Sequence, residues 1–141
     1  MKWDIAQKKV SSFLRSGYDE LKKQKVVNIN HSFPTKPGTY IFIKERKIIY
    51  AGEASELKRR MYRHKKRTEV STLRKSIGFV VFKQAKSGMF SKQIENRINN
   101  YIANLKIKYI EVQYGRKELE EYIINIEKPI HNKVFKGPRS V

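Results

Sequence analysis

The stretch GTYIFIKERKIIYAG, residues 38–52, decides the fold predicted for this chain. Its two ends, GTYIFIK and KIIYAG, are rich in β-branched and aromatic residues, which favours a β-hairpin. No Asn-Gly or Asp-Gly pair demands a two-residue turn, so we expect a three-residue loop at 44–46. With that loop Tyr40 pairs with Tyr50, and both side chains lie on one face of the sheet, because side chains alternate with period 2.

The segments on either side of the hairpin predict the remaining helices and strands. The N-terminal part predicts a helix over 3–15 and a loop over 28–37, which contains two prolines. Downstream, the pattern predicts a helix over 56–67 with Ser55 as its N-cap, a strand over 78–85, a helix over 91–105, an edge strand over 107–114 and a helix over 116–127.

The predicted order ββαβαβα is typical of an α+β domain with a small, mostly antiparallel sheet packed with helices. A short N-terminal helical arm precedes it. We expect three parts: arm and loop over 1–34, a single small domain over 35–134, and a flexible basic tail over 135–141.

The composition indicates a polyanionic partner. The 141 residues include 32 Lys and Arg against 13 Asp and Glu, a net charge of +19. Nucleic acid is the first candidate partner and an anionic membrane surface the second. The absence of cysteine excludes disulfides and thiolate metal sites, and it is compatible with a reducing cytoplasm. No apolar run is typical of a signal peptide or a membrane span, so we expect a cytoplasmic protein.

Arg60 and His64 lie four residues apart on the helix after the hairpin, on the stripe that also carries Leu57 and Met61. An arginine that faces inward is unusual, because burying its charge without a partner is costly. A guanidinium beside an imidazole can receive a phosphate and stabilise the charge that develops on it. Spacing alone leaves a second interpretation open, in which Arg60 extends to solvent and His64 packs in the core.

Glu120 borders the apolar side of the last helix, with Ile123 and Ile124 one turn later. A carboxylate that faces inward needs a cation, and Mg²⁺ with oxygen and water ligands suits a phosphate-binding site. A solvated helix face is the alternative interpretation.

A run of cations surrounds Arg60. We interpret it as a phosphate-backbone contact, although such runs are also typical of solvated faces and targeting patches. The predicted nucleic-acid-binding residues are Arg59, Arg63, Lys65, Lys66, Arg67, Arg74 and Lys75.

These segments together resemble the GIY-YIG nuclease family. GTY and YAG stand where the family has Gly-Ile-Tyr and Tyr-Ile-Gly; YAGEASELKRRMYRH and LEEYIINIEKPIHN are similar to two later family segments. The resemblance implies catalytic roles for Tyr40, Tyr50, Arg60, His64 and Glu120, with Glu120 as the metal ligand. It implies supporting roles for Gly38, Gly52 and Asn132.

The chain departs from the family pattern at four positions. Thr39 and Ala51 replace isoleucines, Glu53 follows YAG, and His131 precedes Asn132. None of them removes a key residue, although the carboxylate of Glu53 would place a negative charge near an incoming phosphate.

The resemblance implies a metal-dependent endonuclease that hydrolyses phosphodiester bonds in DNA, with duplex DNA as partner and Mg²⁺ or Mn²⁺ as cofactor. Restriction, phage defence or a mobile element would suit such an enzyme. In this mechanism Tyr40 helps to deprotonate the nucleophile, and we expect the positive charge of Arg60 and the metal to lower its pKa. Two alternatives stay open: a nucleic-acid-binding module with little turnover, and a nuclease that acts on RNA or single strands. The sequence does not decide between a monomer and a dimer formed on DNA.

Overall fold

The computed structural model describes the backbone of residues 2–133 and the side chains from Val10 onward. The predicted tail, 135–141, lies outside the described residues. The elements are α1 (Lys2–Lys23), β1 (Gly38–Lys44), β2 (Lys47–Ala54), α2 (Leu57–Lys66), a 3-10 turn (Thr68–Val70), α3 (Thr72–Val80), α4 (Lys92–Ala103), β3 (Lys106–Glu111), α5 (Arg116–Glu127) and α6 (Ile130–Lys133). None of the helices in this part of the chain has the length and apolar character needed to cross a bilayer.

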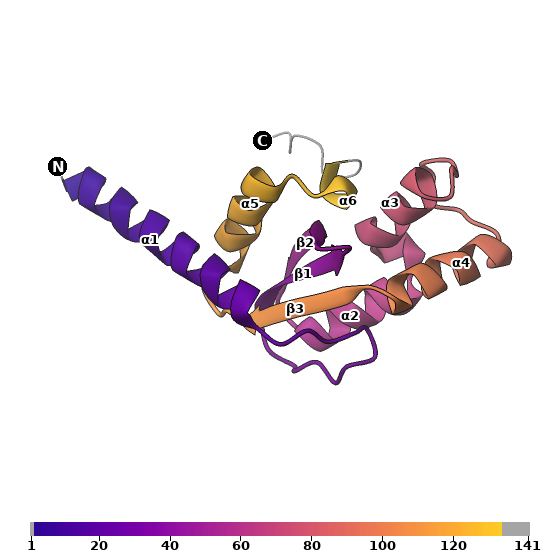
Figure 1. Cartoon of the computed structure of the whole chain (residues 1–141), viewed down its shortest axis with the longest axis horizontal. Helices are drawn as coiled ribbons and strands as arrows, with labels where there is room; N and C mark the ends of the chain where they lie inside the picture. The colour runs from indigo at the N-terminus through magenta and orange to yellow at the C-terminus, as the bar shows by residue number, and fades with distance from the viewer. Residues whose placement is uncertain (1, 134–141) are drawn as a thin grey trace.

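The three strands form one antiparallel sheet in the order β2-β1-β3, so β1 is central and β2 lies at an edge. Helices α2, α3 and α4 lie on one side of this sheet, and α1 and α5 lie on the other (Figure 1). We name the first side the tyrosine face, because Tyr40 and Tyr50 pack there. The second is the opposite face, where Ile41 and Ala51 pack. The predicted α+β architecture with a small antiparallel sheet is confirmed.

The hairpin turn differs from the predicted three-residue loop. Lys44 pairs with Lys47, so the turn consists of Glu45 and Arg46 alone. Both of these residues have positive φ angles, 50° and 67°, as a two-residue turn of the primed type requires. The prediction relied on the missing Asn-Gly or Asp-Gly pair, and here two longer side chains adopt the left-handed conformation instead.

A β-bulge places the two tyrosines on the same face despite this turn. Ile43 pairs with Ile48 but Phe42 pairs with Tyr50, so Ile49 is an extra residue in β2. Without the bulge, the two-residue turn would put Tyr50 on the face away from Tyr40. The prediction of a shared face is therefore confirmed, whereas direct pairing is wrong, because Tyr40 pairs with Gly52.

The strand predicted over 78–85 is absent, and helix α3 occupies the first part of this region. Ser71 is its N-cap, with Oγ accepting a hydrogen bond from the Arg74 backbone N–H at 3.1 Å. Leu73 and Ile77, one turn apart, are both fully buried. Their packing outweighs the β propensity of the Val80-Val81 pair at the end of the helix.

Two further boundaries differ from the prediction. Helix α1 is longer than the helix predicted over 3–15. Helix α2 begins at Leu57 with Glu56 at its N-cap position and no side-chain cap, so Ser55 is not the cap. The carbonyls of Lys36 and Pro34 accept the first N–H groups of α2 instead. Helices α4 and α5 and the edge strand β3 confirm the remaining predicted elements.

Only the first part of the predicted N-terminal arm is separate from the sheet. Tyr18 and Leu21, near the end of α1, pack with Leu119 and Ile123 of α5 on the opposite face. The earlier part of α1 extends away from the sheet (Figure 1). The boundary between 34 and 35 stays a prediction.

Candidate active site

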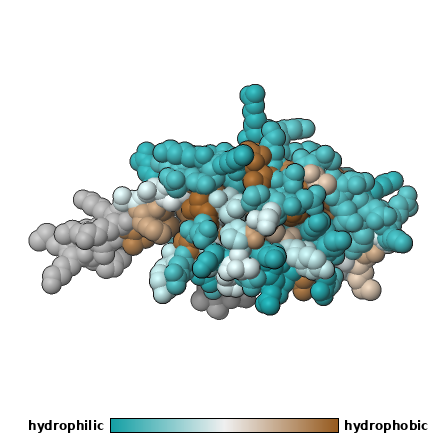
Figure 2. Space-filling model, turned by 90° about the horizontal axis from the view of Figure 1, so that it is seen from below, coloured by the Kyte–Doolittle hydropathy of each residue, from teal (hydrophilic) through white to brown (hydrophobic). Residues whose placement is uncertain are grey.

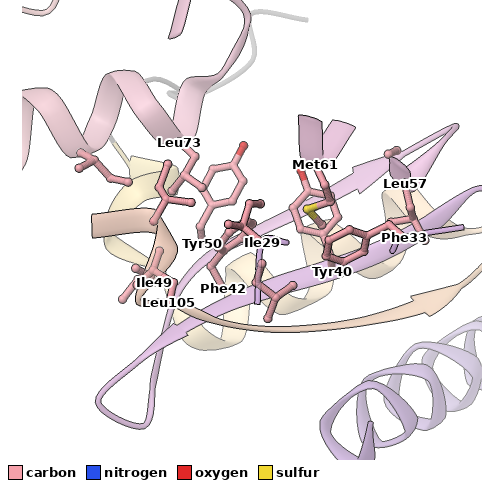
Figure 3. Close-up of a cluster of buried hydrophobic side chains, with 14 of the residues drawn as sticks. Ile29, Phe33, Tyr40, Phe42, Ile49, Tyr50, Leu57, Met61, Leu73 and Leu105 are labelled. Carbon is pink, nitrogen blue, oxygen red and sulfur yellow. The ribbon is translucent and has the colours of Figure 1, made fainter. Parts of the chain in front are cut away.

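Tyr40 and Tyr50 lie in the core of the tyrosine face, 0% and 2% exposed, among large apolar side chains (Figure 3). Their ring centroids are 6.4 Å apart. Each hydroxyl has a polar contact: Tyr40 Oη lies 2.6 Å from His64 Nε2, and Tyr50 Oη lies 2.7 Å from Thr72 Oγ1. The two hydroxyls are therefore built into hydrogen-bonded pairs that phenylalanine could not form.

A hydrogen-bonded chain continues from Tyr40 through His64. The other ring nitrogen, His64 Nδ1, lies 2.7 Å from Ser71 Oγ, and this serine is the N-cap of α3. The imidazole is 1% exposed. One chain of contacts thus links β1, α2 and α3, and it gives a proton a defined path from Tyr40 Oη to His64 Nε2.

Among the protein groups around Tyr40, burial has the largest effect on the pKa of its phenol, and Arg60 by itself does not lower this pKa below the usual value. Burial raises this pKa well above the usual value of 10.0, and Tyr50 and Glu120 raise it further. Arg60 acts in the expected direction, but its charge does not outweigh burial. The Tyr40 hydroxyl is therefore protonated at neutral pH.

Arg60 lies half-buried beside the tyrosines. Its Nη1 donates a hydrogen bond to the backbone carbonyl of Glu53 at 3.2 Å. Burial opposes the charge of the guanidinium, but Tyr40, Tyr50 and Glu53 together outweigh this effect and raise the pKa of Arg60. The side chain is therefore charged at neutral pH.

Glu120 comes from the opposite layer, on α5 between the buried Leu119 and Ile123, and it is 3% exposed. Its charge raises the pKa of Tyr40, so the carboxylate lies within electrostatic reach of the phenol. Within the described residues, no three or more His, Cys, Asp or Glu side chains form a metal-binding group. One buried carboxylate nevertheless fits Mg²⁺, since this ion keeps several waters and often takes one protein carboxylate.

The two glycines of the hairpin are places of close approach. A Cβ on Gly52 would lie 2.3 Å from Tyr40 Oη, and a Cβ on Gly38 would lie 2.3 Å from the backbone oxygen of Ile110. Any larger residue at position 52 would displace the Tyr40 ring, so glycine is needed there to leave room for the phenol.

Asn132 binds the free edge of β2. Its Nδ2 donates to the Ala51 carbonyl at 2.9 Å, and the Ala51 N–H donates to its Oδ1 at 2.8 Å. The neighbouring His131 contacts Ser76 Oγ through Nδ1 at 2.7 Å; burial, with a contribution from Lys44, lowers its pKa to about 4. Asn132 thus holds α6 against β2, which agrees with the supporting position expected for it.

Most of the predicted basic residues lie at or near the surface. Arg59, Lys66 and Arg67 are exposed, while Arg63, Lys65 and Lys75 are half-buried. The face of the molecule shown in Figure 2 is mostly hydrophilic, with apolar residues in small separate patches.

Arg74 is the exception, and its predicted contact with a phosphate backbone is wrong. The side chain is 1% exposed. Its Nη2 donates to Glu95 Oε1 at 2.9 Å, its Nε donates to Thr68 Oγ1 at 2.9 Å, and its Nη1 donates to the backbone carbonyls of His64 and Lys65. Arg74 therefore ties the end of α2 to α3 and α4.

The sequence prediction missed three side chains that position the site. Ser71 contacts His64, Thr72 contacts Tyr50, and Arg116 Nε donates to Glu53 Oε2 at 2.9 Å. This ion pair with Arg116 compensates the negative charge of Glu53, which the sequence analysis expected near an incoming phosphate. A serine just before the Leu73 and Ile77 stripe is an N-cap signal, and it could have located Ser71.

Comparison with known proteins places this geometry in a family. Residues 19–134 match the model of the GIY-YIG catalytic domain. UvrABC system protein C of Aquifex aeolicus is 39% identical over 56 residues, which are 40% of this chain and 10% of that protein. The aligned stretch is therefore a small part of this relative.

Solved structures of the GIY-YIG N-terminal endonuclease domain of UvrC from Thermotoga maritima are also similar. The magnesium-bound form is 24% identical with a TM-score of 0.43, over 71% of this chain and 86% of that one. A point mutant bound to the catalytic divalent cation is 22% identical, with the same TM-score and the same coverage of each chain. The family model matches residues 19–134, which are well over half of this chain. The chain therefore belongs to the GIY-YIG catalytic domain family.

Proposed function

We propose that this chain is a metal-dependent endonuclease that hydrolyses phosphodiester bonds in DNA. The observation that carries the proposal is the hydrogen bond between Tyr40 of β1 and His64 of α2, beside which Arg60 and Glu120 act electrostatically on the same phenol. Family membership and the net charge of +19, which suits a polyanionic substrate, support it.

Arg60 supplies the fixed positive charge. Its guanidinium is planar and presents several N–H donors, which matches the oxygens of a phosphate. Tyr40 and His64 are almost inaccessible, whereas Arg60 is partly exposed beside them. We infer that the substrate phosphate approaches from the Arg60 side and draws the guanidinium towards its oxygens, where it stabilises the charge that develops during attack.

Tyr40 and His64 move the proton. A phenol whose pKa is raised is a poor base by itself, but its oxygen lies 2.6 Å from His64 Nε2. With the His64 proton on Nδ1 and directed at Ser71, Nε2 is an acceptor. The attacking water must reach the buried phenol from the Arg60 side, and Tyr40 then takes a proton from it as it passes its own to His64. Tyr50, held by Thr72, positions the water and the phosphate.

Glu120 would hold the cofactor, Mg²⁺ or Mn²⁺, with water molecules as the remaining ligands. When bound, the ion polarises a phosphate oxygen and assists the departure of the leaving group. The carboxylate of Glu120 also keeps negative charge beside Tyr40, which raises its pKa.

The experiment compares plasmid DNA, linear duplex, single-stranded DNA and RNA, each with Mg²⁺ or with EDTA. We expect the native chain to cleave DNA with Mg²⁺ and to lose activity in EDTA. We expect Glu120→Gln to fold and bind DNA but to cleave at least about 10³-fold more slowly, since the carboxylate that holds the ion is gone.

Glu118→Gln is the matched control, because Glu118 is an exposed carboxylate on the same helix. It should cleave at the wild-type rate. Wild-type cleavage by Glu120→Gln would contradict the metal site. If the native chain binds the four substrates but cleaves none of them, a nucleic-acid-binding module is favoured. Preferential cleavage of RNA would show that RNA, and not DNA, is the substrate.

A further inference from the structure

A groove of about 230 Å³ lies between α2 and the segment 29–33. We name it the α2 groove. Tyr62, Lys58 and Lys65 line it from the helix, and His31 and Phe33 line it from the segment. It is smaller than the roughly 300–1,000 Å³ typical of drug-sized ligands, so its size suits one ring system.

The helix wall of the α2 groove alternates cations and an aromatic ring. Lys58, Tyr62 and Lys65 follow the spacing i, i+4, i+7, so they form one stripe along α2. Tyr62 is 56% exposed, so its ring is accessible to a ligand. A ring between two ammonium groups is the arrangement that single-stranded nucleic-acid sites use to stack a base and contact its phosphates.

The opposite wall is preformed. His31 is exposed, yet its Nε2 lies 2.9 Å from Tyr109 Oη, and its ring packs edge-on against Phe33 with centroids 5.0 Å apart. Asn30 lies in a turn in which its N–H donates to Asn28 Oδ1 at 2.8 Å. An exposed loop held by this many contacts loses little conformational entropy when a ligand binds.

The two walls are joined to each other. The backbone N–H groups of Leu57 and Lys58 donate to carbonyls of Lys36 and Pro34, so the start of α2 is fixed to the chain that follows the groove segment. The buried side chains of Ile29, Phe33 and Met61 form an apolar floor. The groove therefore combines an apolar floor, ring faces, polar loop groups and flanking cations.

We propose that the α2 groove binds one unpaired nucleobase of a nucleic-acid strand, stacked on Tyr62, with Lys58 and Lys65 on the flanking phosphates. This rests on the proposed function and deepens it. Bases in a duplex are already stacked and paired, so the groove selects single-stranded or locally unpaired substrate. Arg60 lies on the same helix, two residues before Tyr62, so it projects from a different side of α2 than the groove does.

The test measures binding, in EDTA so that no strand is cut, by fluorescence anisotropy. Three probes of equal length are compared: a single-stranded oligonucleotide, a strand of abasic sites with the same phosphates, and a duplex. We expect the native chain to bind the base-bearing strand most tightly. Tyr62→Ala should weaken that binding roughly 5- to 150-fold and leave the affinity for the abasic strand unchanged.

Tyr62→Phe keeps the ring and should retain the wild-type affinity. Tyr114→Ala is the matched control, since Tyr114 is also an exposed tyrosine, 81% exposed, and does not line the groove. Lys58→Ala with Lys65→Ala should weaken binding of base-bearing and abasic strands alike. Thermal melts should be unchanged in every variant, because these side chains are not buried.

Equal effects of Tyr62→Ala on the base-bearing and abasic strands, or no effect on either, would overturn the proposal. A role of Tyr62 in protein docking would give that second result. The proposed function fails on a different measurement, the cleavage of DNA by the native chain with Mg²⁺. The two proposals can therefore fail separately.

Discussion

The two faces of the sheet are built from different chemistry. On the tyrosine face, buried hydroxyls, an imidazole and a guanidinium lie within the apolar core: Tyr40, Tyr50, His64, Ser71 and Arg74. On the opposite face the buried residues are mainly aliphatic, and Tyr18 places its hydroxyl at the edge, 2.5 Å from Glu127 Oε2. The hydrogen-bonded groups of the tyrosine face thus lie inside the larger of the two hydrophobic clusters, and Glu120 is a buried charged group on the other side of the sheet.

This difference indicates which buried groups contribute to the chemistry and which contribute to stability. Buried polar groups cost free energy unless they are hydrogen-bonded, and in the described part of the chain no buried side-chain nitrogen or oxygen lacks a partner. The buried hydrogen bonds of the tyrosine face therefore fix geometry, and apolar side chains on both faces supply stability by excluding water. Changes to the Tyr40–His64 pair should therefore alter the rate, whereas truncation of aliphatic side chains on the opposite face should alter stability alone. Glu120, the proposed metal ligand, is the exception on that side of the sheet.

The largest expected effect is on the rate, from Tyr40→Phe. Removal of the hydroxyl breaks the path to His64, so single-turnover cleavage of saturating DNA should slow roughly 10²–10⁴-fold. The structure adds a cost that the sequence did not predict. His64 Nε2 loses this buried partner, so the free energy of unfolding should fall by about 1–3 kcal/mol in a denaturant titration.

Tyr50→Phe is the companion variant, and its rate should fall less, because Tyr50 positions groups and does not transfer the proton. Full activity in both variants would mean that the paired tyrosines are core residues. The two faces would then differ in packing and not in catalysis.

The next effect concerns Arg74, which the sequence placed on the nucleic-acid surface. Arg74→Met removes a buried charge that pairs with Glu95 at 2.9 Å and binds two backbone carbonyls. We expect the free energy of unfolding to fall by about 3–5 kcal/mol. The DNA affinity of the folded protein should not change. Arg59→Met, at an exposed position, should show the reverse pattern; weaker DNA binding by folded Arg74→Met would restore the original interpretation.

On the opposite face, Leu21→Ala tests the apolar core. Leu21 is fully buried on α1, away from the candidate site. Its truncation should lower the free energy of unfolding by about 2–5 kcal/mol, from lost burial and the cavity that remains. Single-turnover cleavage at a temperature where the variant is fully folded should match the wild type. A large loss of rate would show that the two faces are coupled through the sheet.

The smallest expected effect on stability comes from the surface cations of α2. Replacement of Arg63, Lys66 and Arg67 by alanine should change the free energy of unfolding by less than about 0.5 kcal/mol. Binding of DNA should weaken and its salt dependence should flatten, by up to about 0.9 in the logarithmic slope for each lost phosphate contact. A titration of affinity against salt concentration measures both.

A control with equal charge loss replaces Arg15, Lys23 and Lys117, which are exposed on α1 and α5. It should flatten the slope less. Equal slopes for the two triple variants would mean that overall charge, and not the α2 surface, attracts the nucleic acid.

The sequence by itself determined the hairpin, the helices α4 and α5, the edge strand and the family segments. These features depend on local patterns: alternation in GTYIFIK and KIIYAG, an apolar stripe at helical spacing, and fixed distances between tyrosine, glycine and arginine along the chain. Net charge, likewise, needs no fold. The positions of Tyr40, Tyr50, Arg60, His64 and Glu120 in one group agree with the expectation from the resemblance, and their catalytic roles stay proposals.

The tertiary structure decided what depends on residues far apart in the chain. The packing of Leu73 and Ile77 extends α3 as far as Val80, into the stretch 78–85 that was predicted to be a strand, because packing against the core outweighs local propensity. The bulge at Ile49 returns Tyr50 to the face of Tyr40, and this register follows from the whole sheet. The pairing of Arg74 depends on its distance to Glu95 and on the exclusion of water. The balance between Arg60 and burial in setting the pKa of Tyr40 depends on the same two quantities. Both of these quantities exist only once the chain has folded.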